Sequence, residues 1–219
     1  MSSKRRKDVD DESLLQPFLD VVYRELGFDF RRETNRDKQL AGIDLVLSHR
    51  GKDYYIDEKA ATHYVNRPLK TFAFELNFRS YGQLRSGWLF DERKETTHYF
   101  LVSEIHARTN EVSDLTHFRL VSVNRKKLLS YLNSNQWGRQ FFETGLPVLD
   151  EASPKYELSP AAPKARVVKT THLVEEPLNL VIVLDDLIVA GVAKELVPGP
   201  NRLDKNKLKT LFSANGLLD

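Results

Sequence analysis

The sequence contains no cysteine, which excludes disulfide bonds, thiolate zinc sites and cysteine nucleophiles. It also has no apolar run of the ~18 residues that a membrane span requires. The longest mostly apolar stretch, Leu178 to Ala193, is interrupted by Asn179, Asp185 and Asp186. The first 13 residues lack the apolar region of a signal peptide, so we expect the protein to remain in the cytoplasm and away from membranes.

A large charge of either sign is missing too. The formal net charge of the 219 residues is +2, which by itself does not indicate a polyanionic partner. The positive charge is nevertheless clustered: residues 62–85 carry four Lys or Arg and one Glu, and residues 117–142 carry five and no acid. Such clusters are typical of nucleic-acid surfaces, although solvated helix faces produce them as well.

Hydrophobic spacing predicts an α/β protein. A helix with an apolar stripe follows Asp11, strands are expected near residues 28–32, 42–48, 54–61, 98–105 and 118–123, and Asn124 is placed to cap a helix through about residue 133. Residues 149–171 contain three prolines and little periodicity, which indicates a linker or extended arm. A strand at 178–184, a helix at 186–196 and a short basic helix at 203–212 are expected beyond it.

Two of these strands carry charged residues where burial is expected. Asp44 lies in GIDLVLS, and Asp57-Glu58-Lys59 follow the apolar YYI of the next strand, with a tight turn around Gly51 between them. Side chains alternate along a strand, so Asp57 and Lys59 share one face and Glu58 points to the other. A tight turn makes the numbers of facing residues sum to 101 or 103. Both registers place Asp44 on the face of Asp57 and Lys59.

Two converging carboxylates repel each other, and burying them unpaired is costly. A divalent cation with oxygen preference, such as Mg²⁺, would relieve this repulsion and is typically held by one or two carboxylates plus substrate phosphate. Lys59 beside it could orient a water and stabilise a phosphorane-like transition state. The sequence therefore indicates phosphodiester hydrolysis. A cross-strand ion-pair cluster without catalytic function is the structural alternative.

These residues resemble the PD-(D/E)xK nuclease superfamily. Gly42-Ile43-Asp44 matches its first acidic element, with Ile43 in place of the proline, and Asp57-Glu58-Lys59 matches its (D/E)xK triplet. The resemblance covers about residues 11 to 135 and implies that Asp44, Asp57 and the Glu58 carbonyl bind Mg²⁺, with Mn²⁺ able to substitute. It also implies that Lys59 serves the attacking water.

Many members of the superfamily add an acid from the first helix, and Asp20 is the residue we select from Glu12, Asp20 and Glu25. Some carry a glutamine that touches substrate, and Gln83 is the candidate here. His63 follows the triplet and is a candidate phosphate contact. The basic clusters complete the predicted DNA-binding set, and aromatic residues are interleaved in the first cluster. The cations in this set are Arg67, Lys70, Arg79, Arg85, Arg125, Lys126 and Lys127.

The expected architecture is an α/β, restriction-endonuclease-like core with a mixed central sheet flanked by helices and a C-terminal extension. Its divisions are a disordered basic tail (1–10), a nuclease core (11–148), a linker or arm (149–175) and a C-terminal α/β extension (176–219). The expected function is metal-dependent hydrolysis of DNA phosphodiester bonds. The alternative is a catalytically silent module that binds nucleic acid or protein. For residues 150–219, docking on the core, substrate recognition and homodimer formation all remain open.

Overall fold

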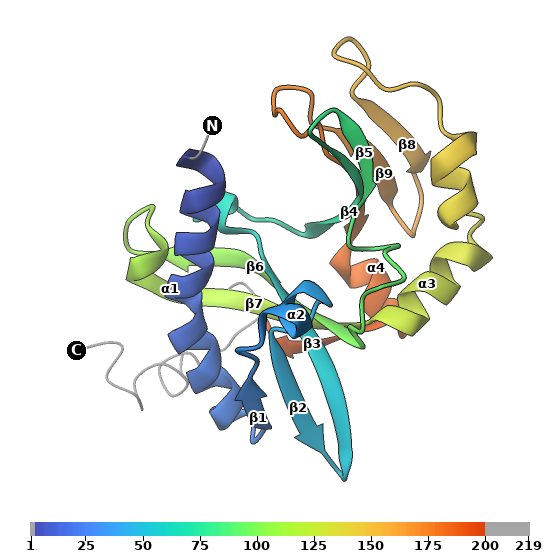
Figure 1. Cartoon of the computed structure of the whole chain (residues 1–219). Coiled ribbons are helices and arrows are strands. Elements are labelled where there is room, and N and C mark those ends of the chain that lie inside the picture. The colour runs from blue at the N-terminus through green and yellow to red at the C-terminus, as the bar shows by residue number, and fades with distance from the viewer. Residues whose placement is uncertain (1–2, 200–219) are drawn as a thin grey trace.

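A long N-terminal helix and two β-sheets form the architecture (Figure 1). The structure is a computed structural model that describes residues 3–199, with side chains described from residue 13 onward. Helix α1 covers Ser3–Glu25, so it begins within the segment expected to be a disordered tail. Leu15, Leu19 and Val22, at helical spacing, are buried against the first sheet. The apolar stripe seen in the sequence is therefore the packing face of α1.

In the described part of the chain, the first sheet has six strands in the order β1-β2-β3-β6-β7-β11. Strands β3 and β6 are parallel and the other neighbours are antiparallel, so the sheet is mixed, as the sequence predicted. The strands are Asp29–Arg32 (β1), Leu45–His49 (β2), Lys52–Ala60 (β3), His98–Ala107 (β6), Leu115–Asn124 (β7) and Ala193–Val197 (β11). The acidic hairpin is formed by β2 and β3.

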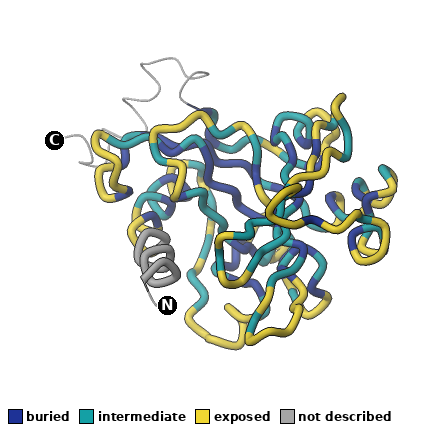
Figure 2. Tube along the Cα trace, turned by 90° about the horizontal axis from the view of Figure 1, so that it is seen from above, coloured by how far each residue is buried: buried dark blue, intermediate teal, exposed yellow. Residues whose placement is uncertain are grey.

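Both faces of this sheet are covered. Along β6, Phe100 and Val102 pack on the α1 side, whereas Tyr99 and Leu101 belong to a second apolar core on the opposite side. This alternation follows from the two-residue period of a strand. Figure 2 shows buried segments through the middle of the molecule and exposed loops around them. A charged side chain in the centre of this sheet must therefore find a polar partner within the protein.

The second sheet closes the other core. Its strand order is β5-β4-β10-β9-β8, with all neighbouring pairs antiparallel. The strands are Thr71–Ser80 (β4), Gln83–Ser86 (β5), Lys155–Ser159 (β8), Ala165–Lys169 (β9) and Leu178–Val183 (β10). Helices α3 (Arg125–Ser134) and α4 (Leu184–Val189) pack beside it. The remaining short elements are α2 (Arg36–Leu40), η1 (Thr62–Tyr64), η2 (Val112–Asp114) and η3 (Phe141–Gly145).

The C-terminal part differs from the expected arm and extension. Residues 149–175 include β8 and β9, and the segment after them supplies β10 to one sheet and β11 to the other. Residues 193–196, expected to be helical, are in β11 instead. The buried Arg119 of β7 donates to Asp185 of α4 at 2.5 Å and to Glu195 of β11 at 2.7 Å. These ion pairs join the C-terminal elements to the first sheet.

Other expectations hold. Asn124 caps α3, because its side chain accepts a hydrogen bond from the backbone N–H of Lys127 at 2.9 Å. The basic helix expected at 203–212 lies outside the described residues. Within residues 3–199, no helix is both long and apolar enough to cross a membrane.

Candidate active site

The β2–β3 hairpin sets the position of the acidic residues. Leu45 pairs with Ile56 and His49 with Lys52, so facing residues sum to 101 rather than 103. The turn residues Arg50 and Gly51 have φ values of 51° and 73°, and positive φ at both positions is typical of a type I′ turn. The paired register ends at Leu45 and Ile56, so Asp44 lies one residue before β2 rather than inside the expected strand, beside Ile56 and Glu58 of β3.

Asp44 is bound to β3 through both its backbone and its side chain. Its N–H donates to the carbonyl of Ile56 at 2.8 Å, and its Oδ2 accepts from the N–H of Glu58 at 2.7 Å. Burial raises the pKa of Asp44 to about 7; the Lys59 charge lowers it, and the Asp57 charge raises it. A carboxylate that is this reluctant to ionise favours a nearby cation.

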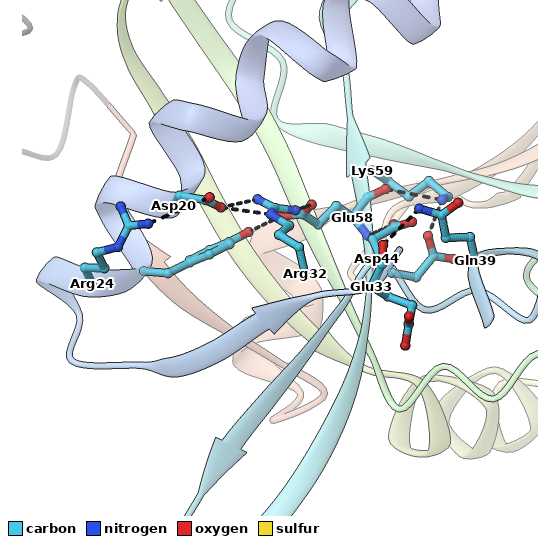
Figure 3. A network of polar contacts seen from close by, with 10 residues as sticks. Asp20, Arg24, Arg32, Glu33, Gln39, Asp44, Glu58 and Lys59 are labelled. Atoms are coloured by element: carbon cyan, nitrogen blue, oxygen red, sulfur yellow. Dashed lines mark hydrogen bonds and ion pairs between the residues drawn. The ribbon is translucent and has the colours of Figure 1, made fainter. Parts of the chain in front are cut away.

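Lys59 supplies a positive charge at the same place. The carboxylate of Asp57 is buried, with the residue 2% exposed, and its Oδ1 forms an ion pair with the Lys59 ammonium. Lys59 Nζ also lies 3.2 Å from the carbonyl oxygen of Glu58 and 5.8 Å from the centre of the Trp88 ring. The ammonium therefore contacts two of the oxygen groups that the sequence assigned to a metal ion (Figure 3).

Glu58 points to the other face, as strand alternation predicted. Its Oε1 accepts from the Tyr23 hydroxyl of α1 at 2.5 Å, and its Oε2 forms an ion pair with Arg32 of β1. Arg32 also donates to Asp20 at 2.8 and 2.6 Å. Burial and the adjacent Glu58 charge raise the pKa of Tyr23 well above its usual value.

This network determines where Asp20 lies. Figure 3 shows Arg32 between Asp20 and Glu58, on the α1 side of the site. The Asp20 carboxylate is thus bound by Arg32, separately from the face that holds Asp57 and Lys59. Arg32 was not identified from the sequence, because a single arginine in a short strand carries no motif. Its effect is to hold the Glu58 side chain while the backbone of Glu58 contacts both Asp44 and Lys59.

A small cavity opens beside these residues. It has a volume of about 110 Å³ and is lined by Asp44, Glu58 and Lys59 together with Gln16 and other residues of α1. This space is large enough for a few waters, which need polar partners of the kind these side chains offer. Small hydrated groups could therefore approach Asp44 and Lys59 from the α1 side.

Residues that are distant in sequence close the other side. Gly42 has a φ of 79°, and a Cβ added there would lie 2.4 Å from Thr96 Oγ1 and 3.4 Å from Asp57 Oδ2. Thr96 donates to the Gly42 carbonyl at 2.7 Å. Glycine is required here by both backbone and space. The Gly-Ile-Asp triplet pointed to Gly42, but no sequence pattern linked Thr96 to it.

The predicted nucleic-acid contacts are dispersed. His63 and Arg67 follow β3, Lys70 precedes β4, and the others lie on the second sheet or on α3. Arg125 is half-buried. The other predicted contacts are exposed: His63, Arg67, Lys70, Arg79, Gln83, Arg85, Lys126 and Lys127.

Some of these cations already have partners within the protein. Arg125 donates to the Tyr99 hydroxyl at 3.0 Å and to the Asp91 carbonyl at 2.8 Å, so its guanidinium points inward. Arg79 forms an ion pair with Glu176 at 3.3 Å. Lys127 Nζ donates to the Gly191 carbonyl at 3.1 Å. Arg67, Lys70, Arg85 and Lys126 are better placed to meet a ligand.

No family model, curated protein or solved structure matches this chain. Within residues 13–199, no group of three or more His, Cys, Asp or Glu side chains is arranged to hold a metal ion. Two carboxylates, one carbonyl and one lysine are therefore the groups from which a function can be inferred.

Proposed function

We propose that this protein is a metal-dependent nuclease that hydrolyses phosphodiester bonds in DNA, with a restriction-endonuclease-like core of the PD-(D/E)xK type. The observation that carries the proposal is the position of the Lys59 ammonium. It lies between the buried Asp57 carboxylate and the Glu58 carbonyl, next to Asp44. A cation is thus already stabilised where the proposed reaction needs positive charge.

The residues present fit a hard divalent cation. Asp44 and Asp57 supply carboxylate oxygens and Glu58 a carbonyl oxygen, which are the donors that Mg²⁺ and Mn²⁺ prefer. The raised pKa of Asp44 reflects burial that a second cation would offset. A protein set of this size leaves coordination positions for water and for phosphate oxygens. The additional ligand expected on α1, Asp20, is not needed, since Arg32 binds its carboxylate.

Each residue then has a defined task. A bound Mg²⁺ would act as a Lewis acid and lower the pKa of its water. Lys59, released from its pair with Asp57, would hold the attacking water and stabilise the charge that develops on the phosphate. Asp44 and Asp57 would position the cation, and the Tyr23–Glu58–Arg32 network would fix the strand that carries them.

One observation favours the silent alternative. Asp57 and Lys59 neutralise each other without any metal, as they would in a purely structural ion pair. In a module that only binds nucleic acid or protein, this pair would persist in the presence of Mg²⁺.

Incubation of supercoiled plasmid and linear duplex and single-stranded DNA with Mg²⁺, Mn²⁺ or a chelator tests the proposal. We expect cleavage with either metal and none with the chelator. Asp57→Asn should be inactive. Asp53→Asn, which changes an exposed acid on the same strand, should retain activity. This difference between two variants purified in the same way would exclude a contaminating nuclease. Equal cleavage by both variants, or no cleavage of any substrate by the wild type, would contradict the proposal.

A further inference from the structure

The loop before β6 brings a second lysine, Lys94, to the candidate active site. A Cβ placed on Gly42 would lie 3.0 Å from Lys94 Cδ and 3.4 Å from Asp57 Oδ2. Two atoms this close to one point are separated by no more than the sum of these distances. The ammonium extends two bonds beyond Cδ, so it can reach a ligand that is bound beside Asp57. The sequence predicted no site residue in this loop.

The two carboxylate oxygens of Asp57 have different surroundings. Oδ1 forms the ion pair with Lys59. Oδ2 lies on the side of Gly42 and Lys94, and no group from residue 13 to 199 donates a hydrogen bond to it. Oδ2 is therefore the oxygen of Asp57 that remains for a metal ion. A phosphate held on this side would be within reach of Lys94.

Lys94 is also the cation of its loop that no carboxylate neutralises. The three acids of the loop are paired with other cations: Asp91 with Arg93 at 2.8 Å, Glu92 with Arg139 at 2.8 Å and Glu95 with Lys38 at 2.9 Å. Lys94 makes no ion pair with any residue from 13 to 199, and its Nζ donates to the Leu40 carbonyl at 2.8 Å. Its positive charge therefore remains available to an anion.

The backbone at Lys94 is fixed, whereas its ammonium can exchange partners. The N–H of Glu95 donates to the Ala41 carbonyl at 2.8 Å, and the Lys94 carbonyl accepts from Arg125 Nη1 at 3.4 Å. The bond from Lys94 to the Leu40 carbonyl is exposed, so water can replace the ammonium there. A lysine that is held in this way can bind phosphate as a point charge at little cost in ordering.

We propose that Lys94 binds the substrate phosphate at the candidate active site, by exchanging the Leu40 carbonyl for a non-bridging phosphate oxygen. The inference rests on the proposed nuclease function and gives it a second lysine, on the Oδ2 side of Asp57, whereas Lys59 lies on the Oδ1 side. Without a metal ion, the carboxylates of Asp44 and Asp57 would repel the phosphate. The contribution of Lys94 should therefore depend on the metal.

Fluorescence anisotropy of a labelled short DNA duplex, with Ca²⁺ as the metal, tests this contact without depending on cleavage. Lys94→Ala should weaken binding about tenfold, because one hydrogen bond between charged groups is lost. It should also reduce the log-log salt slope by about 0.9, the value for one phosphate contact. Lys94→Arg keeps the charge and should restore most of the affinity. Lys38→Ala is the matched control and should bind like wild type, since Glu95 already neutralises this neighbouring exposed lysine.

The same titrations with a chelator distinguish a contact at the candidate active site from one elsewhere on the surface. Wild type and Lys94→Ala should then bind with similar affinity, because the unscreened acids keep the phosphate away. Wild-type affinity and slope for Lys94→Ala with Ca²⁺, an equal loss with and without metal, or no DNA binding by the wild type would overturn the inference.

These results are distinct from failure of the proposed function. A protein that cuts DNA while Lys94→Ala binds like wild type would keep its function and lose this contact. Metal-dependent binding that requires Lys94, without cleavage of any DNA, would do the reverse.

Discussion

We expect the protonation of Asp44 to decide when the candidate site can accept a cation. Its pKa is raised from 3.8 to about 7 because the carboxyl is buried, despite the favourable Lys59 charge. The folded, metal-free protein therefore holds this proton through a range in which the unfolded chain has released it. The stability linked to Asp44 is present at low pH and is lost as the pH rises toward 7.

Metal binding should show the opposite dependence on pH, because the cation competes with the proton on Asp44. We expect the apparent Mn²⁺ affinity to fall about tenfold for each pH unit below 7 and to level off above it. Calorimetric titrations from about pH 5.5 to about pH 8.5 measure this. Asp44→Asn should bind weakly at every pH. A wild-type affinity that is constant across the range would show that Asp44 is not a ligand.

Tyr23 is a second residue whose contribution can be measured separately. Its hydroxyl donates to the charged, largely buried Glu58 carboxylate at 2.5 Å. Tyr23→Phe should lower the free energy of unfolding by about 1.5–3 kcal/mol, the usual range for a hydrogen bond to a charged group. Urea denaturation measures the change. Tyr54→Phe, on β3, is the control and should have little effect; equal effects of the two substitutions would argue against the network.

At the scale of elements, the loop before β2 closes on the loop before β6 through Gly42 and Thr96. Gly42→Ala would combine a positive φ with a Cβ only 2.4 Å from Thr96 Oγ1. We expect a loss of stability of about 2–4 kcal/mol, which combines backbone strain with displacement of a packed side chain. Gly51→Ala is the matched control, because its φ is 73° with no atom within 4 Å. It should cost about 1 kcal/mol for the left-handed backbone alone. Thermal unfolding measures the stability of both variants. Equal losses of stability would show that the Thr96 contact is unimportant.

The elements also show what could be predicted from sequence. The β2–β3 hairpin was predictable because alternation, a Gly-containing turn and two strands all agreed. The strands β8 and β9 were not, since they are short and separated by prolines, and β9 joins the sheet by pairing with β10, which follows it in sequence. Likewise, α4 is only six residues long, and β11 begins shortly after it. A helix of this length is too short for its end to be seen in the hydrophobic pattern.

The arrangement of the candidate site was predictable to the same extent. The proximity of Asp44, Asp57 and Lys59 was predicted because strand alternation is a local rule. Arg32 and Thr96 were missed because their contacts depend on how distant segments meet. Arg125 was expected to contact DNA phosphates, yet tertiary packing turns its guanidinium toward Tyr99.

At the scale of the whole molecule, we expect the exposed cations to mark the proposed DNA-binding surface. Arg85 on β5 and Lys126 on α3 are exposed, and neither makes an ion pair within residues 13–199. Arg85→Ala/Lys126→Ala should reduce the log-log salt slope for duplex DNA by about two units, because each phosphate that a cation no longer neutralises lowers the slope by about 0.9. Binding across a salt series with Ca²⁺ measures the slope. Arg166→Ala/Lys194→Ala, on β9 and β11, should leave it unchanged. If the first pair also leaves it unchanged, the DNA path lies elsewhere.

The most direct test of the proposed mechanism is the single-turnover rate of DNA cleavage by Lys59→Ala at saturating Mg²⁺. Lys59 contacts both Asp57 and the Glu58 carbonyl, and its proposed task is to hold the water and stabilise the transition-state charge. We predict a rate at least ~10²-fold below wild type with metal binding retained, whereas Lys52→Ala, an exposed lysine at the start of the same strand, should cleave normally. Cleavage by Lys59→Ala at the wild-type rate would show that this lysine only neutralises the acids, and would contradict the proposed mechanism.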